Sequence, residues 1–207
     1  MKRVLFFSLL AIFFFFFPLL RRGVGGEAFA QLGWWTWMKG SGVVPPNQTA
    51  AGNYGTIGVT APANTPPGLY EACEWTDATG KFWIYGGSNG SPGAGYYSAL
   101  WMFDPATNNW TWVNGSSTAG LAPVYGLQGV PAAGNTPGAR GWGISTWADA
   151  QGNLWLFGGS TPGGWYSDLW KYNIVSDMWT WMNGPNVPNQ PGVYGTQLIP
   201  NAANYPR

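Results

Sequence analysis

The chain has 207 residues, of which 8% are charged, and it contains 32 glycines, 17 prolines, 15 tryptophans and no histidine. Without histidine, this sequence excludes Ser-His-Asp and Cys-His catalysis and histidine-ligated zinc or copper. The net charge is +1, and it becomes −2 for residues 31–207, because four of the nine basic residues but one of the eight acidic residues precede them. No basic stripe remains, so nucleic acid is not an expected partner. Tryptophan is scarce in disordered chains, and its abundance here predicts a packed domain.

Residues 1–30 are typical of a secretory signal peptide. Lys2 and Arg3 precede an apolar run at 4–20, and the small-x-small pattern Ala28-Phe29-Ala30 follows. The alternative is an uncleaved membrane anchor, because the run reaches the lower length limit for a bilayer span and is followed directly by Arg21-Arg22. Either reading predicts that residues 31–207 are exported, as a secreted or cell-surface protein.

The rest of the chain repeats itself at an interval of about 70 residues. The phrases WTWMKG, WTWVNG and WTWMNG stand at 35–40, 110–115 and 179–184, and WIYGGS at 83–88 corresponds to WLFGGS at 155–160. Such self-similarity indicates a supersecondary unit that is used repeatedly. We expect units at about 66–115 and 137–184, a lone strand at 34–40, and a partial unit from 185.

Each unit is predicted to contain four short strands. The second strand is apolar at every position in both units, which indicates that both faces of each sheet are buried. Asp and Gly in DATGK and DAQGN suit tight hairpins between the first two strands. No helical periodicity is present. The expected strands are about 69–77, 81–86, 98–104 and 109–114 in the first unit, and 139–148, 153–158, 167–173 and 178–183 in the second.

Four-stranded antiparallel sheets repeated in series predict an all-β fold, a β-propeller. At these positions the chain resembles the kelch repeat, which galactose-oxidase-like propellers share. The residues that carry the resemblance are Gly86, Gly87, Tyr97 and Trp110, and again Gly158, Gly159, Tyr166 and Trp179. The resemblance covers residues 34–207, although Arg140, which stands at the opening of the second unit, has no counterpart in the first. It implies a scaffold of kelch-type blades and not the copper chemistry of the oxidases, whose histidine ligands are missing here.

A propeller closes with about four to eight blades, whereas this chain supplies about two full blades and partial ones. Two blades leave broad aromatic faces open. We therefore expect the sequence to be the N-terminal portion of a longer propeller, or to associate with other chains. In the first case the strand at 34–40 would complete a final blade.

The sequence predicts no catalytic residues, no cofactor and no metal site. The equivalent Asp77 and Asp149 fall in hairpin turns, and Glu71 and Glu74 are spaced to face opposite sides of a strand. No pair of carboxylates is arranged as a glycosidase requires. Cys73 is the single cysteine and is expected to be a small buried apolar residue.

Long loops are the expected place for binding. In a four-stranded blade, the loop between strands two and three (87–97 or 159–166) emerges on the same face as the linker between blades (about 115–138, and again from 184). Aromatic planes beside amide groups suit sugar rings, although the aromatic residues could instead fix the loops to the blades. Trp165 is the strongest individual candidate, because the first unit has Gly95 there. The candidate ligand-binding residues are Trp165, Tyr166, Tyr96, Tyr97, Tyr125 and Asn89.

The function that we expect from the sequence is that of an exported, non-enzymatic kelch-repeat protein that binds glycan or protein through one face of the propeller. Two alternatives stay open. The chain could be a structural or self-assembling module of the cell surface, or the N-terminal part of a larger propeller enzyme whose catalytic residues lie elsewhere.

Overall fold

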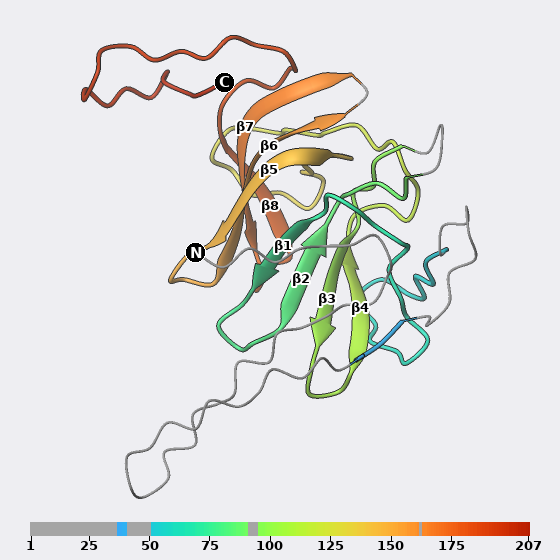
Figure 1. Ribbon diagram of the computed structural model, residues 1–207. Coiled ribbons are helices and arrows are strands. Elements are labelled where there is room, and N and C mark those ends of the chain that lie inside the picture. Colours follow the sequence, from blue (N-terminus) through green and yellow to red (C-terminus); the bar gives the residue numbers. More distant parts are fainter. Residues whose placement is uncertain (1–36, 41–50, 91–94, 162) are drawn as a thin grey trace, which may run out of the picture.

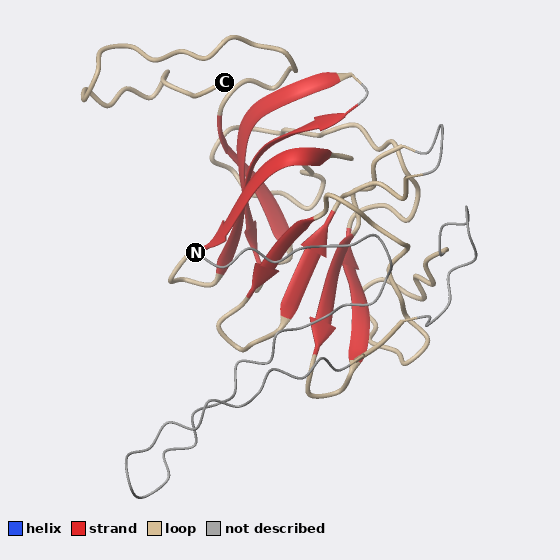
Figure 2. Ribbon diagram, viewed as in Figure 1, coloured by secondary structure: helices blue, strands red, loops and turns tan. Residues whose placement is uncertain are grey.

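The computed structural model describes residues 37–40, 51–90, 95–161 and 163–207 (Figure 1). The predicted signal peptide and the first residues of the lone strand, 34–36, lie outside these ranges. The described part contains strands and loops, with no helix, and so has no helix with the length and apolar character to span a membrane (Figure 2). The strands are β1 (Cys73–Thr76), β2 (Phe82–Tyr85), β3 (Leu100–Asp104), β4 (Asn109–Asn114), β5 (Gly141–Ala148), β6 (Asn153–Thr161), β7 (Gly164–Asn173) and β8 (Met178–Asn183).

The strands form two antiparallel four-stranded sheets, β1-β2-β3-β4 and β5-β6-β7-β8, and each follows chain order. The all-β prediction and the two four-strand units are thus confirmed. Both first hairpins are held by their aspartate, as the turn chemistry predicts. The Asp77 carboxylate accepts the Thr79 and Lys81 backbone N–H groups at 2.8 and 3.1 Å, and Asp149 does the same for Gln151 and Asn153.

Two strand boundaries differ from the sequence prediction. β1 begins at Cys73 instead of about residue 69, because Glu71 adopts a left-handed backbone conformation (φ 55°) that interrupts an extended strand. In the second sheet β6 and β7 continue to Thr161 and from Gly164. The predicted loop at 159–166 is therefore mostly a strand hairpin, and Trp165 and Tyr166 lie on β7.

The main core lies between the two sheets. β1 and β5 are the neighbouring strands, and the Trp75 indole N–H donates to the Trp155 carbonyl at 2.9 Å. Aromatic rings meet across the interface, with Tyr85 5.2 Å from Trp179 between ring centroids. The buried members are Cys73, Trp75, Trp83, Tyr85, Leu100, Leu154, Leu156, Trp170, Tyr172 and Trp179.

The two sheets differ in how much of their outer face is covered. The far face of the first sheet forms a second core around Trp101, Phe103 and Trp110, against which Met38 and Tyr54 pack. The first sheet is therefore buried on both faces, as the apolar second strand predicts. Within the described residues nothing comparable covers the outer face of the second sheet, where Trp147 is 44% exposed although the equivalent Trp75 is 5% exposed, so the prediction of two buried faces is not met for this sheet.

The Gly-Gly pair at the end of β2 joins the two sheets. The Gly87 N–H donates to the Arg140 carbonyl at 2.9 Å, and a Cβ added to Gly86 would collide with that carbonyl. Both glycines have positive φ values, 71° and 83°, which L-residues with side chains rarely adopt. The close approach of two backbones therefore requires glycine here.

Candidate functional site

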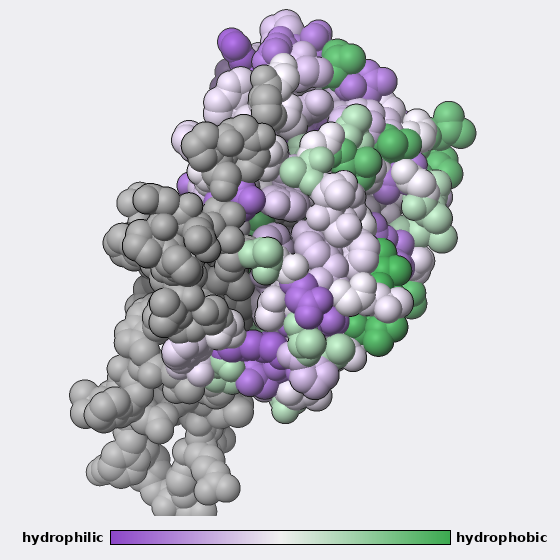
Figure 3. All heavy atoms as spheres, turned by 90° about the vertical axis from the view of Figure 1, so that its right-hand side faces the viewer, coloured by the Kyte–Doolittle hydropathy of each residue, from purple (hydrophilic) through white to green (hydrophobic). Residues whose placement is uncertain are grey.

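The hairpin between the second and third strands and the following linker meet along one edge of the molecule. The Gly120 N–H donates to the Tyr96 carbonyl at 2.8 Å, and the Asn189 N–H donates to the Trp165 carbonyl at 2.7 Å. The prediction that hairpin and linker share a face is thus confirmed in both units. Figure 3, which shows the right-hand side of Figure 1, displays apolar residues in small groups among polar ones over the described surface.

A cleft of about 350 Å³ opens beside the second sheet on this edge. Trp165 is 59% exposed, and its ring lies against Gly143, where an added Cβ would be 3.4 Å from the ring. Asn189 fixes the backbone of Trp165, because its side-chain oxygen accepts the Trp165 N–H at 3.0 Å. The cleft therefore combines an accessible aromatic plane with polar groups. Its lining residues are Gly143, Phe157, Gly158, Gly159, Trp165, Tyr166, Ser167, Asn189, Gln190 and Arg207.

A second cleft, of about 440 Å³, lies beside the first sheet. Two predicted site residues meet in it, because the Asn89 amide donates to the Tyr97 hydroxyl at 3.2 Å. Tyr54, which lies before the first sheet in the chain, lines the same cleft. The remaining lining residues are Ala51, Gly52, Pro67 and Ser117.

Tyr96 and Tyr125 are placed away from the lining of both clefts. Tyr96 packs where the sheets join, and a Cβ added to Gly141 would be 2.7 Å from its ring. The Tyr125 ring packs on Trp170 at 5.1 Å between centroids, and its hydroxyl donates to Asp168 at 2.7 Å. Of the six predicted residues, the structure therefore groups Trp165 with Tyr166 and Tyr97 with Asn89.

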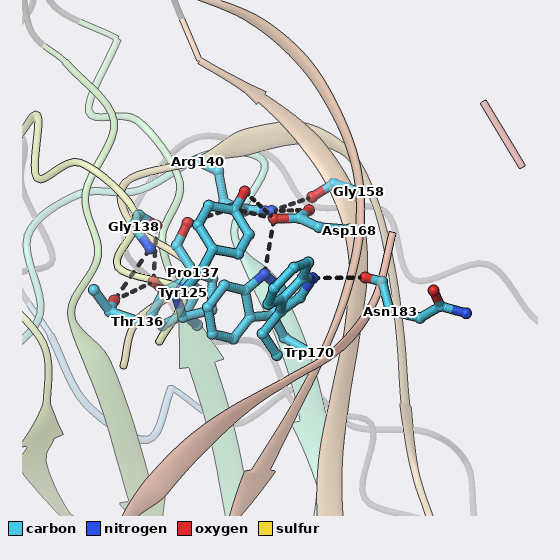
Figure 4. Close-up of polar contacts among 11 residues, drawn as sticks. Tyr125, Thr136, Pro137, Gly138, Arg140, Gly158, Asp168, Trp170 and Asn183 are labelled. Carbon is cyan, nitrogen blue, oxygen red and sulfur yellow. Dashed lines mark hydrogen bonds and ion pairs between the residues drawn. The ribbon is translucent and has the colours of Figure 1, made fainter. Parts of the chain in front are cut away.

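A buried ion pair lies beneath the first of these clefts (Figure 4). The Arg140 guanidinium donates to both carboxylate oxygens of Asp168, at 2.7 and 3.1 Å, and both side chains are fully buried. It also donates to the carbonyls of Gly158, at 3.0 Å, and Pro137. The guanidinium carbon lies 4.7 Å from the centroid of the Tyr166 ring, so the network supports a residue of the cleft.

Asp168 collects further donors from the aromatic residues around it. The Tyr125 hydroxyl and the Trp170 indole N–H both donate to one carboxylate oxygen, at 2.7 and 2.8 Å. Burial, with the Asp168 charge next, raises the pKa of Tyr125, so its hydroxyl remains a donor at neutral pH. Burial alone would lower the pKa of Arg140, but the carboxylate of Asp168 raises it above its ordinary value. The guanidinium therefore keeps its charge, and its two terminal nitrogens are bonded, whereas its buried Nε has no partner in the described part of the chain.

The first sheet lacks this network. Ala99 stands where the second sheet has Asp168. The buried Tyr54 hydroxyl and Trp101 indole N–H, which correspond to the two aromatic donors, therefore lack the shared carboxylate acceptor. The sequence reasoning singled out Arg140 but missed Asp168. A signal was available, because the arginine and the aspartate are absent together from the first unit.

The structure offers few groups for catalysis. In the described ranges, no three His, Cys, Asp or Glu side chains lie together as metal ligands would. Cys73 is free and buried in the core between the sheets, as expected, and burial raises the pKa of its thiol. A thiol in that state is a poor nucleophile.

Comparisons with known proteins give no relative from which a role could be transferred. No protein-family model matches the sequence, and a search of curated proteins found no match either. The function of the chain is therefore inferred from the geometry of the two clefts.

Proposed function

We propose that this chain is an exported, non-enzymatic binding protein whose loop-bearing edge takes up carbohydrate at the Trp165 cleft. The observation that carries the proposal is the exposed Trp165 ring on β7, whose backbone N–H is held by Asn189, in a cleft that Gln190 and Arg207 also line. A flat apolar ring suits the C–H face of a sugar, and amide and guanidinium groups can bond its hydroxyls.

The second part of the proposal concerns the scaffold. We infer that the two sheets are blades of a kelch-type β-propeller, the architecture that the Gly-Gly and tryptophan positions resemble. Support comes from the face-to-face packing of the consecutive sheets and from the close backbone contact of Gly86 and Gly87 with Arg140 at their junction. Binding in loops on one edge of a rigid scaffold is consistent with this architecture.

The direct test is a glycan array with the purified chain, followed by calorimetric titration of any glycan that binds. Trp165→Ala should weaken binding about tenfold to a hundredfold, which corresponds to loss of a buried aromatic contact of about 1.4 to 2.8 kcal/mol. Trp165→Phe retains an aromatic plane and should recover part of the affinity.

The matched control is Trp147→Ala. Trp147 is also an exposed tryptophan, but it lies on the open face of the second sheet, stacked on Trp155 with a centroid distance of 5.7 Å, and does not line the cleft. This variant should bind as the unaltered chain does. Equal losses from the two variants, or no glycan bound by a correctly folded chain, would contradict carbohydrate binding at this cleft.

A further inference from the structure

The two sheets treat one equivalent place in different ways. In the second sheet the ion pair of Arg140 and Asp168 fills the space between two tyrosine rings. The Tyr125 hydroxyl donates to Asp168 at 2.7 Å (Figure 4), and the guanidinium carbon of Arg140 lies 4.7 Å from the centroid of the Tyr166 ring. A carboxylate of the chain itself is therefore the acceptor at this place.

The first sheet has the same backbone there without the arginine. Leu69 stands two residues before Glu71, and Arg140 stands two residues before Trp142. Glu71 and Trp142 share a left-handed backbone conformation, with φ values of 55° and 50°, so the two segments superpose at these residues. Leu69 thus occupies the position of Arg140 and brings no charge to the first sheet.

The second cleft described above, of about 440 Å³, lies at the equivalent place beside the first sheet, and we call it the Tyr54 cleft. Tyr54 and Tyr97 line it, and they correspond to Tyr125 and Tyr166, the two tyrosines that flank the ion pair. Ala99 gives the first sheet a methyl group where the second sheet has a carboxylate. The flanking tyrosines are therefore kept, and the acceptor between them is missing from the first sheet.

The Tyr54 hydroxyl is a buried donor at this place. Burial raises its pKa, Tyr97 nearby raises it further and the Trp101 indole N–H opposes both, so the hydroxyl keeps its proton at neutral pH. In the described ranges no acceptor for that proton lies within hydrogen-bonding distance. An acceptor group in the Tyr54 cleft would supply the bond that the corresponding hydroxyl of the second sheet makes to Asp168.

Two further donors belong to the same place. Trp101 is fully buried and corresponds to Trp170, whose indole N–H donates to Asp168 at 2.8 Å. The Tyr97 hydroxyl accepts the Asn89 amide at 3.2 Å, so its own proton remains to be donated. No charged side chain among the described residues lines the cleft, so no carboxylate of the chain competes for these donors. Hydrogen bonds to an ionised acceptor are about twice as strong as those to a neutral one, which favours an anion.

We propose that the Tyr54 cleft binds the carboxylate group of a small acidic ligand, whose oxygens take the place that Asp168 fills in the second sheet. A carboxylate is the expected group because the chain itself satisfies the equivalent tyrosine and tryptophan donors with one. The site lies beside the other sheet from the Trp165 cleft, and it does not depend on carbohydrate binding there.

Titration of the ¹⁵N-labelled full chain with sodium glucuronate, followed by NMR of the indole N–H groups, tests the proposal. The Trp101 signal, identified by its loss in Trp101→Phe, should shift and reach saturation. Glucuronamide, which differs in lacking the charge, should bind at least about tenfold more weakly. Sodium propionate distinguishes the source of the carboxylate. Binding of propionate as well indicates a general carboxylate site, and binding of glucuronate alone indicates a site for acidic sugars.

Variants with matched controls locate the site. Tyr54→Phe keeps the ring and removes the hydroxyl, so it should weaken glucuronate binding about tenfold or more. Tyr125→Phe removes the corresponding hydroxyl, which is bonded to Asp168, and should bind glucuronate normally. Ala99→Asp places a carboxylate of the chain at the site and should block binding, and near-UV circular dichroism shows whether each variant is folded. If Ala99→Asp does not fold, the two phenylalanine variants carry the test.

Three results would overturn the proposal. The first is a Trp101 signal that neither carboxylate shifts, and the second is equal binding of glucuronate and glucuronamide. The third is a loss of glucuronate binding in Trp165→Ala but not in Tyr54→Phe, which would place the ligand in the other cleft. Normal glucuronate binding in Trp165→Ala, with loss in Tyr54→Phe, would support the carboxylate site whether or not the Trp165 cleft binds carbohydrate.

Discussion

The most informative perturbation of the fold is Asp168→Ala, which removes the carboxylate that four donors share. Arg140 would be left fully buried without its counter-charge, and removal of one partner of a buried ion pair typically costs about 3–5 kcal/mol. Tyr125 and Trp170 would each lose an acceptor as well, at about 1 kcal/mol or more. We expect a loss of at least about 4 kcal/mol, a large share of the roughly 5–15 kcal/mol by which domains are stable.

The double variant Arg140→Met/Asp168→Leu separates the value of the pair from the penalty of an unpaired charge. It removes both charges and fills the space with apolar groups, so it should cost clearly less than Asp168→Ala, about 1–2 kcal/mol. The first sheet already folds with Ala99 at the corresponding position and without the arginine. Urea denaturation followed by tryptophan fluorescence measures the free energies of unfolding.

A double variant as unstable as Asp168→Ala would contradict the penalty that we assign to the unpaired guanidinium. In that case the network would stabilise through its bonds alone, and the unpaired guanidinium would carry no special penalty. A loss below about 1 kcal/mol in Asp168→Ala would likewise show that water reaches Arg140 and replaces the carboxylate.

Three further predictions follow from individual contacts. Burial alone would raise the pKa of Asp149, but hydrogen bonds from Trp155 and its neighbours lower it to about 2, below the unfolded value of about 3.9. Its stabilisation is therefore present above about pH 4 and lost as the pH falls through about 2, and Asp149→Asn should flatten urea midpoints measured across that range. The Cys73 thiol should react with a thiol reagent only after denaturation, and rapid reaction of the native chain would contradict its burial. Asn135→Ala should cost about 2 kcal/mol in unfolding free energy, because the Val130 and Trp179 carbonyls both lose the Asn135 amide as a donor. Asn204 makes the corresponding bond to the carbonyl five residues earlier, but in an exposed loop and with no second bond to a strand, so Asn204→Ala should cost less than about 0.5 kcal/mol.

Much of the architecture could be predicted from the sequence because its signals are local. The apolar second strands, the Asp-x-x-Gly turns and the spacing of the Trp-Thr-Trp phrases located eight strands and their order. The alternation of side chains along a strand, and the geometry of tight turns, depend on a few neighbouring residues. The prediction that the loop between strands two and three lies on the same edge as the linker followed from the strand order of a four-stranded antiparallel sheet.

The candidate site was predicted less completely, because its parts come together only through packing. Both Tyr125 and Trp165 were predicted to lie in a binding face, with Trp165 the stronger candidate, but the Tyr125 hydroxyl bonds to a carboxylate on β7 and Trp165 is exposed at a cleft. The distinction depends on Asp168, which lies 43 residues from Tyr125 in the chain.

By itself the sequence determined that the chain is all-β, that its four-strand unit occurs twice, and that histidine-based chemistry is excluded from these residues. Only the tertiary structure decided which aromatic side chains are buried and which are exposed to solvent. Burial of a side chain depends on which residues of the neighbouring sheet and linker pack against it. The same reason applies to the repeated tyrosines Tyr54, Tyr125 and Tyr194, which stand at corresponding places in the sequence. Among the described residues, Tyr54 and Tyr125 pack on the second tryptophan of a fourth strand, whereas Tyr194 is exposed, as is Trp37 in the first Trp-Thr-Trp phrase.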